Sequence, residues 1–140
     1  MIEMIIFLWF VLTLNVINIS AFDFETCYRP QDKDELKNAV RNKAWNDVTY
    51  GPINNWCIDH ITDFSRLFFD DWNFNEDISQ WNVSQVTDMS HMFRSATAFN
   101  QRINSWNVSK VIDMTDMFWG ASSFNQPLNK IMFRLLLAKK

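Results

Sequence analysis

The chain repeats itself with a period of 25 residues. The phrase WNVSQVTDMSHMF begins at Trp81, and WNVSKVIDMTDMF begins at Trp106. Residues 62–86 and 87–111 are identical at 12 of 25 positions. A fixed period of this size is typical of proteins in which each repeat stacks on the next. The repeat therefore predicts a solenoid.

Large apolar side chains fall into register when the chain is shifted by 25 residues. Such columns usually form the core of a solenoid, so we expect them to be buried; an exposed sugar-stacking platform is the alternative. The columns are Trp56, Trp81 and Trp106; Ile58, Val83 and Val108; Ile61, Val86 and Val111; Phe68, Phe93 and Phe118; Phe74, Phe99 and Phe124; and Ile53, Ile78, Ile103 and Leu128.

Each repeat contains three local patterns. The segment WNVSQVTDM, from Trp81, predicts a short strand, and SHMFRSATAF, from Ser90, has the apolar spacing of one or two helical turns. The Asn-rich FNQRINSW, from Phe99, predicts a turn and a return segment. We therefore predict the α/β class, as a short leucine-rich-repeat-like solenoid of parallel strands and short helical turns over residues 53–129.

The segments on either side of the repeats differ from them. Residues 21–52 predict an N-terminal cap, since Asp32 and Glu35 form a capping-box pattern. Residues 130–140 predict an irregular apolar and basic tail, because Ile131 stands where the period requires Trp. The capping helix would present one apolar face, made by Leu36, Ala39, Val40 and Ala44.

Residues 1–20 predict a signal peptide or an N-terminal anchor. Met4 to Leu14 is an apolar run of the length found in secretory signals, and Asn15 and Asn18 interrupt it before it could span a membrane. Glu3 and the absence of Lys or Arg ahead of this run are atypical of a signal, so an uncleaved anchor and a misassigned start stay open. We expect a secreted or cell-surface protein.

Composition narrows the range of partners. The formal net charge is −3, which does not favour binding to nucleic acid or to an anionic membrane surface. With 13 Phe and 7 Trp, the 140-residue chain has enough apolar surface to fold. We expect one ordered domain that does not bind nucleic acid.

The two cysteines, Cys27 and Cys57, leave two states open. A disulfide between them would tie the N-terminal segment to the repeats and stabilise an exported protein by about 3 kcal/mol. Two unpaired thiols are the alternative, and pairing depends on export to an oxidising compartment.

The quoted phrases, together with DELKNAV, YGPINNW and GASSFNQPLN, resemble the BspA-type leucine-rich-repeat surface proteins. More narrowly, they are similar to a 25-residue repeat family of unknown function from mycoplasma surface lipoproteins, over residues 33–129. The resemblance implies an extracellular or surface protein that serves in adhesion or partner binding, and it carries no catalytic residues across. No lipobox precedes Cys27, so lipid anchoring is not implied.

No pattern predicts an enzyme, a cofactor or a metal site. His60 and His91 share their columns with unrelated polar residues, as exposed positions do, and no phosphate loop, nucleophile motif or Cys/His metal spacing occurs. Stacked carboxylates in the column of Asp63, Asp88 and Asp113 would repel one another. We expect hydrogen bonds to the following turn to stabilise them, with calcium as the alternative.

Two Asn-Val-Ser sequences are glycosylation acceptors if the chain passes through a glycosylating pathway. They begin at Asn82 and Asn107. A ladder of asparagines that satisfies backbone groups between successive repeats is the alternative that we favour.

The best candidates for contact with a partner are variable polar positions in the repeat. We predict a non-catalytic binding protein, and two alternatives stay open: self-association through the apolar C-terminal edge, and a fragment of a longer repeat array. The candidate contact residues are Arg66, Gln85, His91, Lys110 and Asp116.

Overall fold

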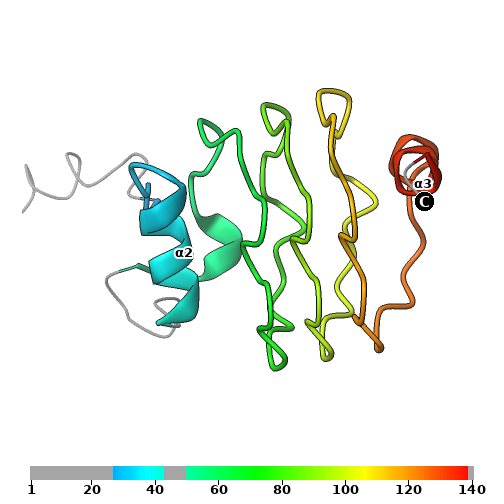
Figure 1. Cartoon of the computed structure of the whole chain (residues 1–140). Helices are drawn as coiled ribbons and strands as arrows, with labels where there is room; N and C mark the ends of the chain where they lie inside the picture. Colours follow the sequence, from blue (N-terminus) through cyan, green and yellow to red (C-terminus); the bar gives the residue numbers. More distant parts are fainter. Residues whose placement is uncertain (1–26, 43–49, 139–140) are drawn as a thin grey trace, which may run out of the picture.

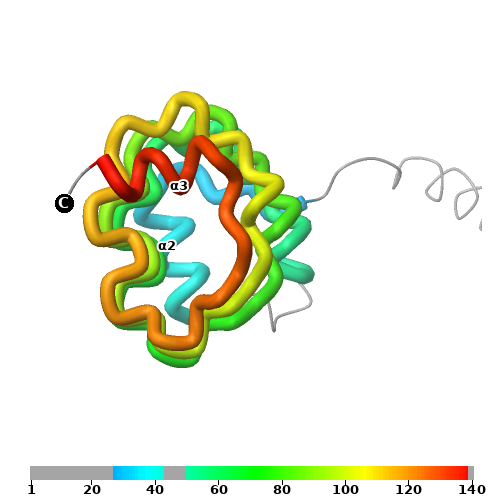
Figure 2. The backbone as a smooth tube through the Cα atoms, turned by 90° about the vertical axis from the view of Figure 1, so that its right-hand side faces the viewer, coloured from blue at the N-terminus to red at the C-terminus, as the bar shows by residue number. Residues whose placement is uncertain are grey.

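The repeats stack along one axis between two terminal helices. The computed structural model describes residues 27–42 and 50–138, with helices α2 (Lys33–Arg41), η2 (a 3-10 helix, Ile53–Asn55) and α3 (Lys130–Leu137). We call residues 53–77, 78–102 and 103–127 rungs 1, 2 and 3. The rungs lie side by side with α2 at one end and α3 at the other (Figure 1). Along the stack axis they superpose around a common interior (Figure 2).

Backbone hydrogen bonds join each rung to the next at every second residue. In rung 1, the N–H groups of residues 64, 66, 68 and 70 donate to carbonyls 24 positions ahead, over 2.8–3.0 Å. Rung 2 repeats the arrangement from residues 89, 91, 93 and 95, over 2.8–2.9 Å. Because the offset is 24 residues in every case, the rungs stack without a shift in register.

The predicted α/β solenoid of parallel strands and short helical turns is wrong. Within residues 27–42 and 50–138 the only β-pairing consists of two isolated parallel bridges, Asp63–Asp88 and Asp88–Asp113, and rungs 2 and 3 contain turns but no helix. Left-handed residues cause this difference, because a positive φ interrupts both an extended strand and a right-handed helix. They recur twice per rung: Arg66, His91 and Asp116 at φ 51–56°, and Asp70, Ser95 and Gly120 at φ 58–76°.

The predicted apolar columns do form the core, which contains no buried polar or charged residue in the described chain. Two columns of phenylalanines make parallel stacks through the rungs. Phe93 lies 5.2 Å from Phe68 and 5.5 Å from Phe118 between ring centroids, with interplanar angles of 0° and 6°. The second stack contacts the first, since Phe99 lies 3.9 Å from Phe93. Burial of these rings is the main source of stability.

The tryptophan column also connects successive rungs by hydrogen bonds. Trp81 Nε1 donates to the Ile53 carbonyl of rung 1 at 2.7 Å, and Trp106 Nε1 donates to the Ile78 carbonyl of rung 2 at 3.2 Å. Both indoles are 3% exposed, so water does not replace these donors. The column therefore requires tryptophan rather than any large aromatic residue.

Replacing Trp81 with phenylalanine tests that requirement. The smaller phenyl ring keeps an aromatic group in the core, but the Ile53 carbonyl loses its indole donor, and we expect the free energy of unfolding to fall by about 1–2 kcal/mol. Urea denaturation measures the change. The control is Trp72→Phe at an indole that is 69% exposed, where we expect less than about 0.5 kcal/mol. Equal losses in the two variants would contradict the role of the indole N–H.

Helix α2 covers the N-terminal end of the stack. Asp32 Oδ1 accepts from the Glu35 N–H at 2.8 Å, and Glu35 Oε2 accepts in return from the Gln31 N–H at 2.8 Å. Its apolar face buries three of the four predicted residues, Leu36, Ala39 and Val40, while Ala44 lies outside the described residues. Helix α2 lies within residues 21–52, the range predicted as an N-terminal cap.

Helix α3 occupies the segment for which the sequence predicted an irregular tail. Asn129 begins it, since its side-chain oxygen accepts from the Met132 N–H at 2.9 Å while its Nδ2 donates to the Asn104 carbonyl at 3.2 Å. Met132 is fully buried against the end of the stack, but Ile131, at the position of the missing tryptophan, is 51% exposed. The helix therefore covers the last rung with one face only.

Candidate functional site

The five predicted contact residues lie in two rows along the stack. Gln85 and Lys110 form the first row, where Lys110 Nζ donates to Gln85 Oε1 at 2.6 Å across rungs 2 and 3. Both residues are exposed. No hydrogen bond or ion pair in the described part of the chain links this row to the other three residues. Gln85 and Lys110 can therefore be substituted without disturbing the core.

The second row is more closely tied to the fold. Arg66, His91 and Asp116 have positive φ angles of 55°, 56° and 51°, and their side chains do not share one environment. His91 Nδ1 is buried with no hydrogen-bond partner in the described residues, and it lies 3.8 Å from Asp116 Oδ2. The shared column predicted an exposed position, but the His91 side chain is only 22% exposed and lies beside Asp116 of rung 3.

Two residues that the sequence did not single out complete this surface. Arg94 Nη1 is 2.9 Å from Asp116 Oδ2, and the Arg94 guanidinium carbon is 4.3 Å from the ring centroid of Trp119. Rung 1 has a looser counterpart, with Arg66 5.5 Å from the ring of Phe69. One repeat position holds Phe69, Arg94 and Trp119, which differ in chemistry. The 25-residue period therefore did not mark this position as part of a site.

The aspartate column is stabilised as the sequence predicted, by hydrogen bonds to the following turn. Asp63, Asp88 and Asp113 each accept a backbone N–H two residues ahead, over 2.7–2.8 Å. Lys33 of α2 also donates to Asp63 Oδ2 at 2.8 Å. Burial alone would raise the pKa of Asp63, but the hydrogen bonds from Lys33 and Ser65 outweigh it, so this pKa lies below its ordinary value.

No cluster of three or more His, Cys, Asp or Glu side chains suited to a metal occurs in the described ranges. Each aspartate oxygen that faces a turn is already occupied by an N–H donor, which favours the turn role over the calcium alternative for this column.

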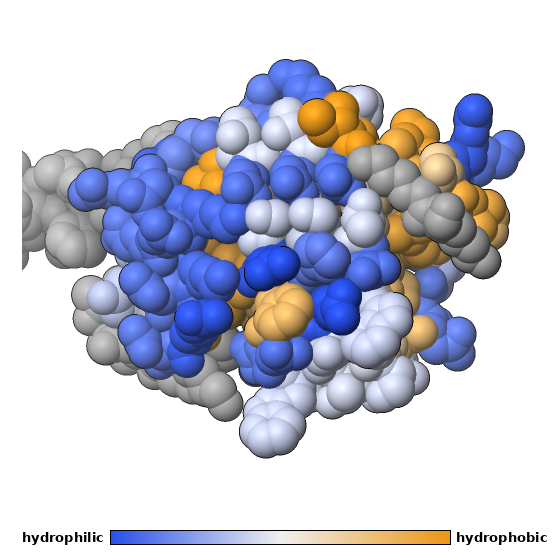
Figure 3. All heavy atoms as spheres, viewed as in Figure 1, coloured by the Kyte–Doolittle hydropathy of each residue, from blue (hydrophilic) through white to orange (hydrophobic). Residues whose placement is uncertain are grey.

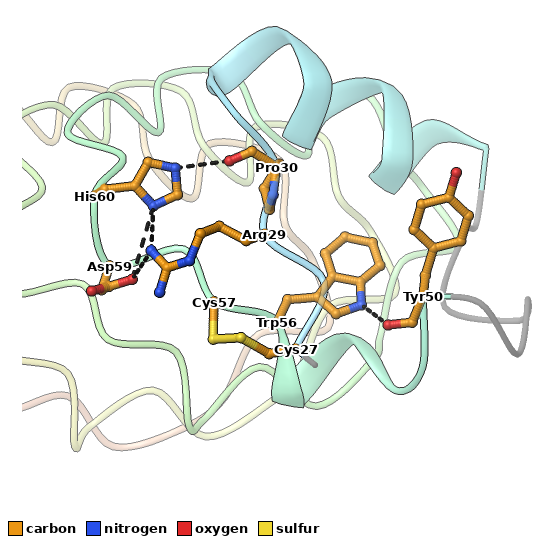
Figure 4. The surroundings of a disulfide bond; sticks show 8 residues. All are labelled: Cys27, Arg29, Pro30, Tyr50, Trp56, Cys57, Asp59 and His60. Atoms are coloured by element: carbon orange, nitrogen blue, oxygen red, sulfur yellow. Dashed lines mark hydrogen bonds and ion pairs between the residues drawn. A yellow bond between two sulfur atoms is a disulfide. The ribbon is translucent and has the colours of Figure 1, made fainter. Parts of the chain in front are cut away.

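Cys27 and Cys57 form a disulfide, with their Cα atoms 5.6 Å apart. The Cys57 N–H also donates to the Tyr28 carbonyl at 2.9 Å. The bridge therefore fastens the chain ahead of α2 to rung 1 (Figure 4).

His60 joins the same segment to rung 1. Its Nε2 is 2.8 Å from the Pro30 carbonyl, which can only accept, so Nε2 carries the proton. Nδ1 is then the acceptor for Arg29 Nη1 at 3.2 Å, and Arg29 Nη1 also pairs with Asp59 Oδ1 at 2.9 Å. Figure 4 shows these side chains together beside the disulfide. His60 is thus a structural link at the head of the Gln85–Lys110 row.

Tyr28 makes the N-terminal junction sensitive to high pH. Burial, together with the hydrogen bond from its hydroxyl to Glu35 Oε1 at 3.1 Å, raises the pKa of Tyr28 to about 12. The folded phenol holds its proton more tightly than the unfolded one, whose pKa is about 10. The stability that this group contributes is therefore complete below pH 10 and lost as the pH rises from 10 to 12.

We expect the free energy of unfolding to fall by about 1–2 kcal/mol over that interval, since partial exposure screens the effect. Urea denaturation at pH 8.5, 10 and 11.5 measures it. Tyr28→Phe should remove most of the decline, whereas the control Tyr50→Phe should retain it. A decline of the same size in Tyr28→Phe would assign the effect to other groups.

The asparagine ladder exists, but at a different column from the one predicted. Asn82 and Asn107 are exposed, and each side-chain oxygen accepts from the N–H two residues ahead at 3.2 Å, within its own rung. The ladder between rungs is made by Asn75, Asn100 and Asn125. The Asn100 N–H donates to Asn75 Oδ1 at 2.8 Å, and the Asn125 N–H donates to Asn100 Oδ1 at 2.9 Å.

The segment predicted as a signal peptide or anchor, residues 1–20, lies outside the described residues. Where the structure is described, no helix combines the length and the apolar character that a membrane crossing requires.

The repeat corresponds to a known family. A family model described as "Mycoplasma protein of unknown function, DUF285" matches residues 34–136, from α2 through all three rungs to α3. No curated protein and no solved structure matches the chain. Because the matched region covers most of the sequence, the chain belongs to the DUF285 family.

Proposed function

We propose that this chain is an exported or cell-surface repeat protein that binds a macromolecular partner and catalyses no reaction. The observation that carries this proposal is the Gln85–Lys110 row. Its two exposed side chains are held in register by a stack whose core they do not enter. A rigid row of exchangeable polar side chains is suited to recognition, because little conformational entropy is lost on binding. The resemblance to BspA-type surface proteins supports the same role.

Export is supported by the disulfide and by the composition of residues 1–20. Disulfides persist in oxidising compartments and are rare in the reducing cytosol, so a Cys27–Cys57 bridge fits a secreted or surface protein. We propose a protein or another cell-surface macromolecule as the partner and give nucleic acid no role, in keeping with the net charge of −3.

Binding of the full chain to a panel of purified extracellular-matrix and cell-surface glycoproteins tests this function. Gln85 and Lys110 suit mutation better than the second row, since neither has a positive φ angle. We expect at least one saturable partner whose affinity falls at least fivefold with Gln85→Glu plus Lys110→Glu, at unchanged melting temperature.

The control is Arg102→Glu, an exposed charge outside both rows, which should bind within twofold of the native chain. Saturable binding that is equally tight in the double variant would contradict the role of the row. A panel with no saturable partner would contradict the proposed function.

Self-association is the second candidate, and the outer face of α3 favours it. Ile131, Phe133 and Leu137 are 51–55% exposed, and a hollow of about 280 Å³ is lined by Ile131, Arg134, Leu135 and Ala138. In Figure 3 the hydrophobic colour gathers at the right-hand end, over α3. Light scattering from 10 µM to 500 µM tests this, with Phe133→Glu as the variant expected to restore a monomer. A strict monomer throughout contradicts it.

A further inference from the structure

A hollow of about 440 Å³ opens between rungs 1 and 2. Asp70, Trp72, Ser95 and Thr97 line it. The side chain of Trp72 is 69% exposed, more than any other large aromatic residue in the described chain. A tryptophan with this exposed fraction is typical of binding surfaces, because its ring offers a large contact area that the protein's own core does not cover.

The backbone around the hollow is fixed by contacts between the two rungs. The Trp72 carbonyl accepts from the Ala98 N–H at 3.0 Å and from the Thr97 hydroxyl at 3.1 Å. The Asp70 N–H donates to the Arg94 carbonyl at 2.9 Å. The positions from which the Asp70 and Trp72 side chains project are therefore set before any ligand arrives.

Asp70 and Trp72, which line the hollow, come from an acidic stretch of the sequence. Between Arg66 and Arg94 there is no Lys or Arg, and five carboxylates occur. The Asp70 side chain is exposed, and its carboxylate makes no hydrogen bond or ion pair within the described ranges. A carboxylate in this setting attracts cations. The five acidic residues are Asp70, Asp71, Glu76, Asp77 and Asp88.

The same surface shows how this chain holds a cation. One rung further on, the guanidinium of Arg94 lies 4.3 Å from the Trp119 ring centroid and 2.9 Å from Asp116 Oδ2. One indole and one carboxylate together bind that group by cation–π attraction and a charged hydrogen bond. Trp72 and Asp70 bring the same two groups to the hollow, where no side chain of the described residues supplies the cation.

We propose that this hollow binds an arginine or lysine side chain of the partner protein, stacked on Trp72 and paired with Asp70. The inference rests on the proposed function and gives the partner a chemical class, namely a basic segment exposed on a protein. A neutral glycan would also use an exposed tryptophan and nearby hydroxyls. The acidic setting favours the cation, and a glycan is one outcome of the test.

The test follows the Trp72 indole N–H by NMR on the isotope-labelled full chain, with its resonance assigned by its loss in Trp72→Phe. The probes are N-acetylated, amidated hexa-arginine, the matched neutral hexa-citrulline, and maltohexaose. We expect saturable shifts with hexa-arginine and at least tenfold weaker binding of hexa-citrulline. Raising the salt concentration from 50 to 300 mM should weaken hexa-arginine binding.

Two substitutions separate the site from the general charge of the rung. Asp70→Asn removes the carboxylate while keeping a residue that tolerates the positive φ of 58°, and Trp72→Ala removes the ring. Each should weaken hexa-arginine binding at least fivefold, with the Trp72→Ala effect read from backbone amides of the hollow. Asp77→Asn removes the same charge from the same rung outside the hollow and should bind within twofold of the native chain.

Three results of the peptide and glycan titrations would overturn the inference. These are equal effects of Asp70→Asn and Asp77→Asn, saturation of the Trp72 resonance by maltohexaose but not by hexa-arginine, and no saturable peptide binding. Partner binding in the glycoprotein panel that is unchanged by Asp70→Asn and Trp72→Ala would also overturn it, and would leave the proposed function standing. Peptide binding that depends on Asp70, without any partner in the panel, would overturn the proposed function alone.

Discussion

Replacing Phe93 with alanine is expected to lower the free energy of unfolding by about 3–5 kcal/mol. The Phe93 ring is fully buried and lies between Phe68 and Phe118 in one stack, with Phe99 of the second stack 3.9 Å away. Truncation therefore removes buried apolar area and leaves a cavity that interrupts the first stack and removes its contact with Phe99 of the second. Urea denaturation followed by fluorescence and by circular dichroism measures the loss.

Phe118→Ala is the matched control, because it removes the same side chain from the same column at the partly exposed end of the stack. Phe118 contacts Phe93 on one side and Phe124 within its own rung, and no further rung covers it. We expect about half the loss seen for Phe93. Equal losses, or a loss below about 1 kcal/mol for Phe93→Ala, would contradict a continuous stack.

Loss of the Cys27–Cys57 disulfide has the next largest expected effect. The bridge joins residues 30 positions apart, and closing a loop of that length removes conformational entropy from the unfolded chain. We expect Cys27→Ser plus Cys57→Ser to lower the free energy of unfolding by about 3 kcal/mol. Parallel urea curves of the oxidised protein and the double variant measure this.

Dithiothreitol provides the control for this prediction. It should shift the native protein toward the midpoint of the double variant and leave the double variant unchanged. A native protein whose midpoint is insensitive to the reductant, despite full reduction confirmed by thiol titration, would show that the junction does not depend on the bridge.

The buried columns could be predicted from the sequence because the 25-residue period places equivalent side chains in equivalent surroundings. The backbone could not. Arg66, His91 and Asp116 adopt the left-handed conformation although none is glycine, and only Gly120 in the other left-handed column signals a positive φ. The spacing of apolar residues predicted short strands and helical turns. Spacing alone does not reveal residues with a positive φ, which interrupt both.

The candidate site was predictable only where it follows the period. Gln85 and Lys110 were expected to be neighbours, and they are hydrogen-bonded across the rungs. The sequence did not single out Trp72 and Trp119, because each differs in type from the residues at the equivalent positions of the other rungs. A search for columns of similar residues does not find such positions. The useful signal was the opposite one: a tryptophan outside the tryptophan column has no place in the core and lies on the surface.

The asparagine ladder gives the molecule a direction of assembly. Asn75 offers its side-chain oxygen to the N–H of Asn100, and Asn100 offers its own to Asn125, so each rung presents an acceptor to the rung that follows it in sequence. A chain emerging from the ribosome delivers α2 first and then the rungs in that order. Every new rung thus meets a finished template, and folding can proceed by addition without waiting for the C-terminus.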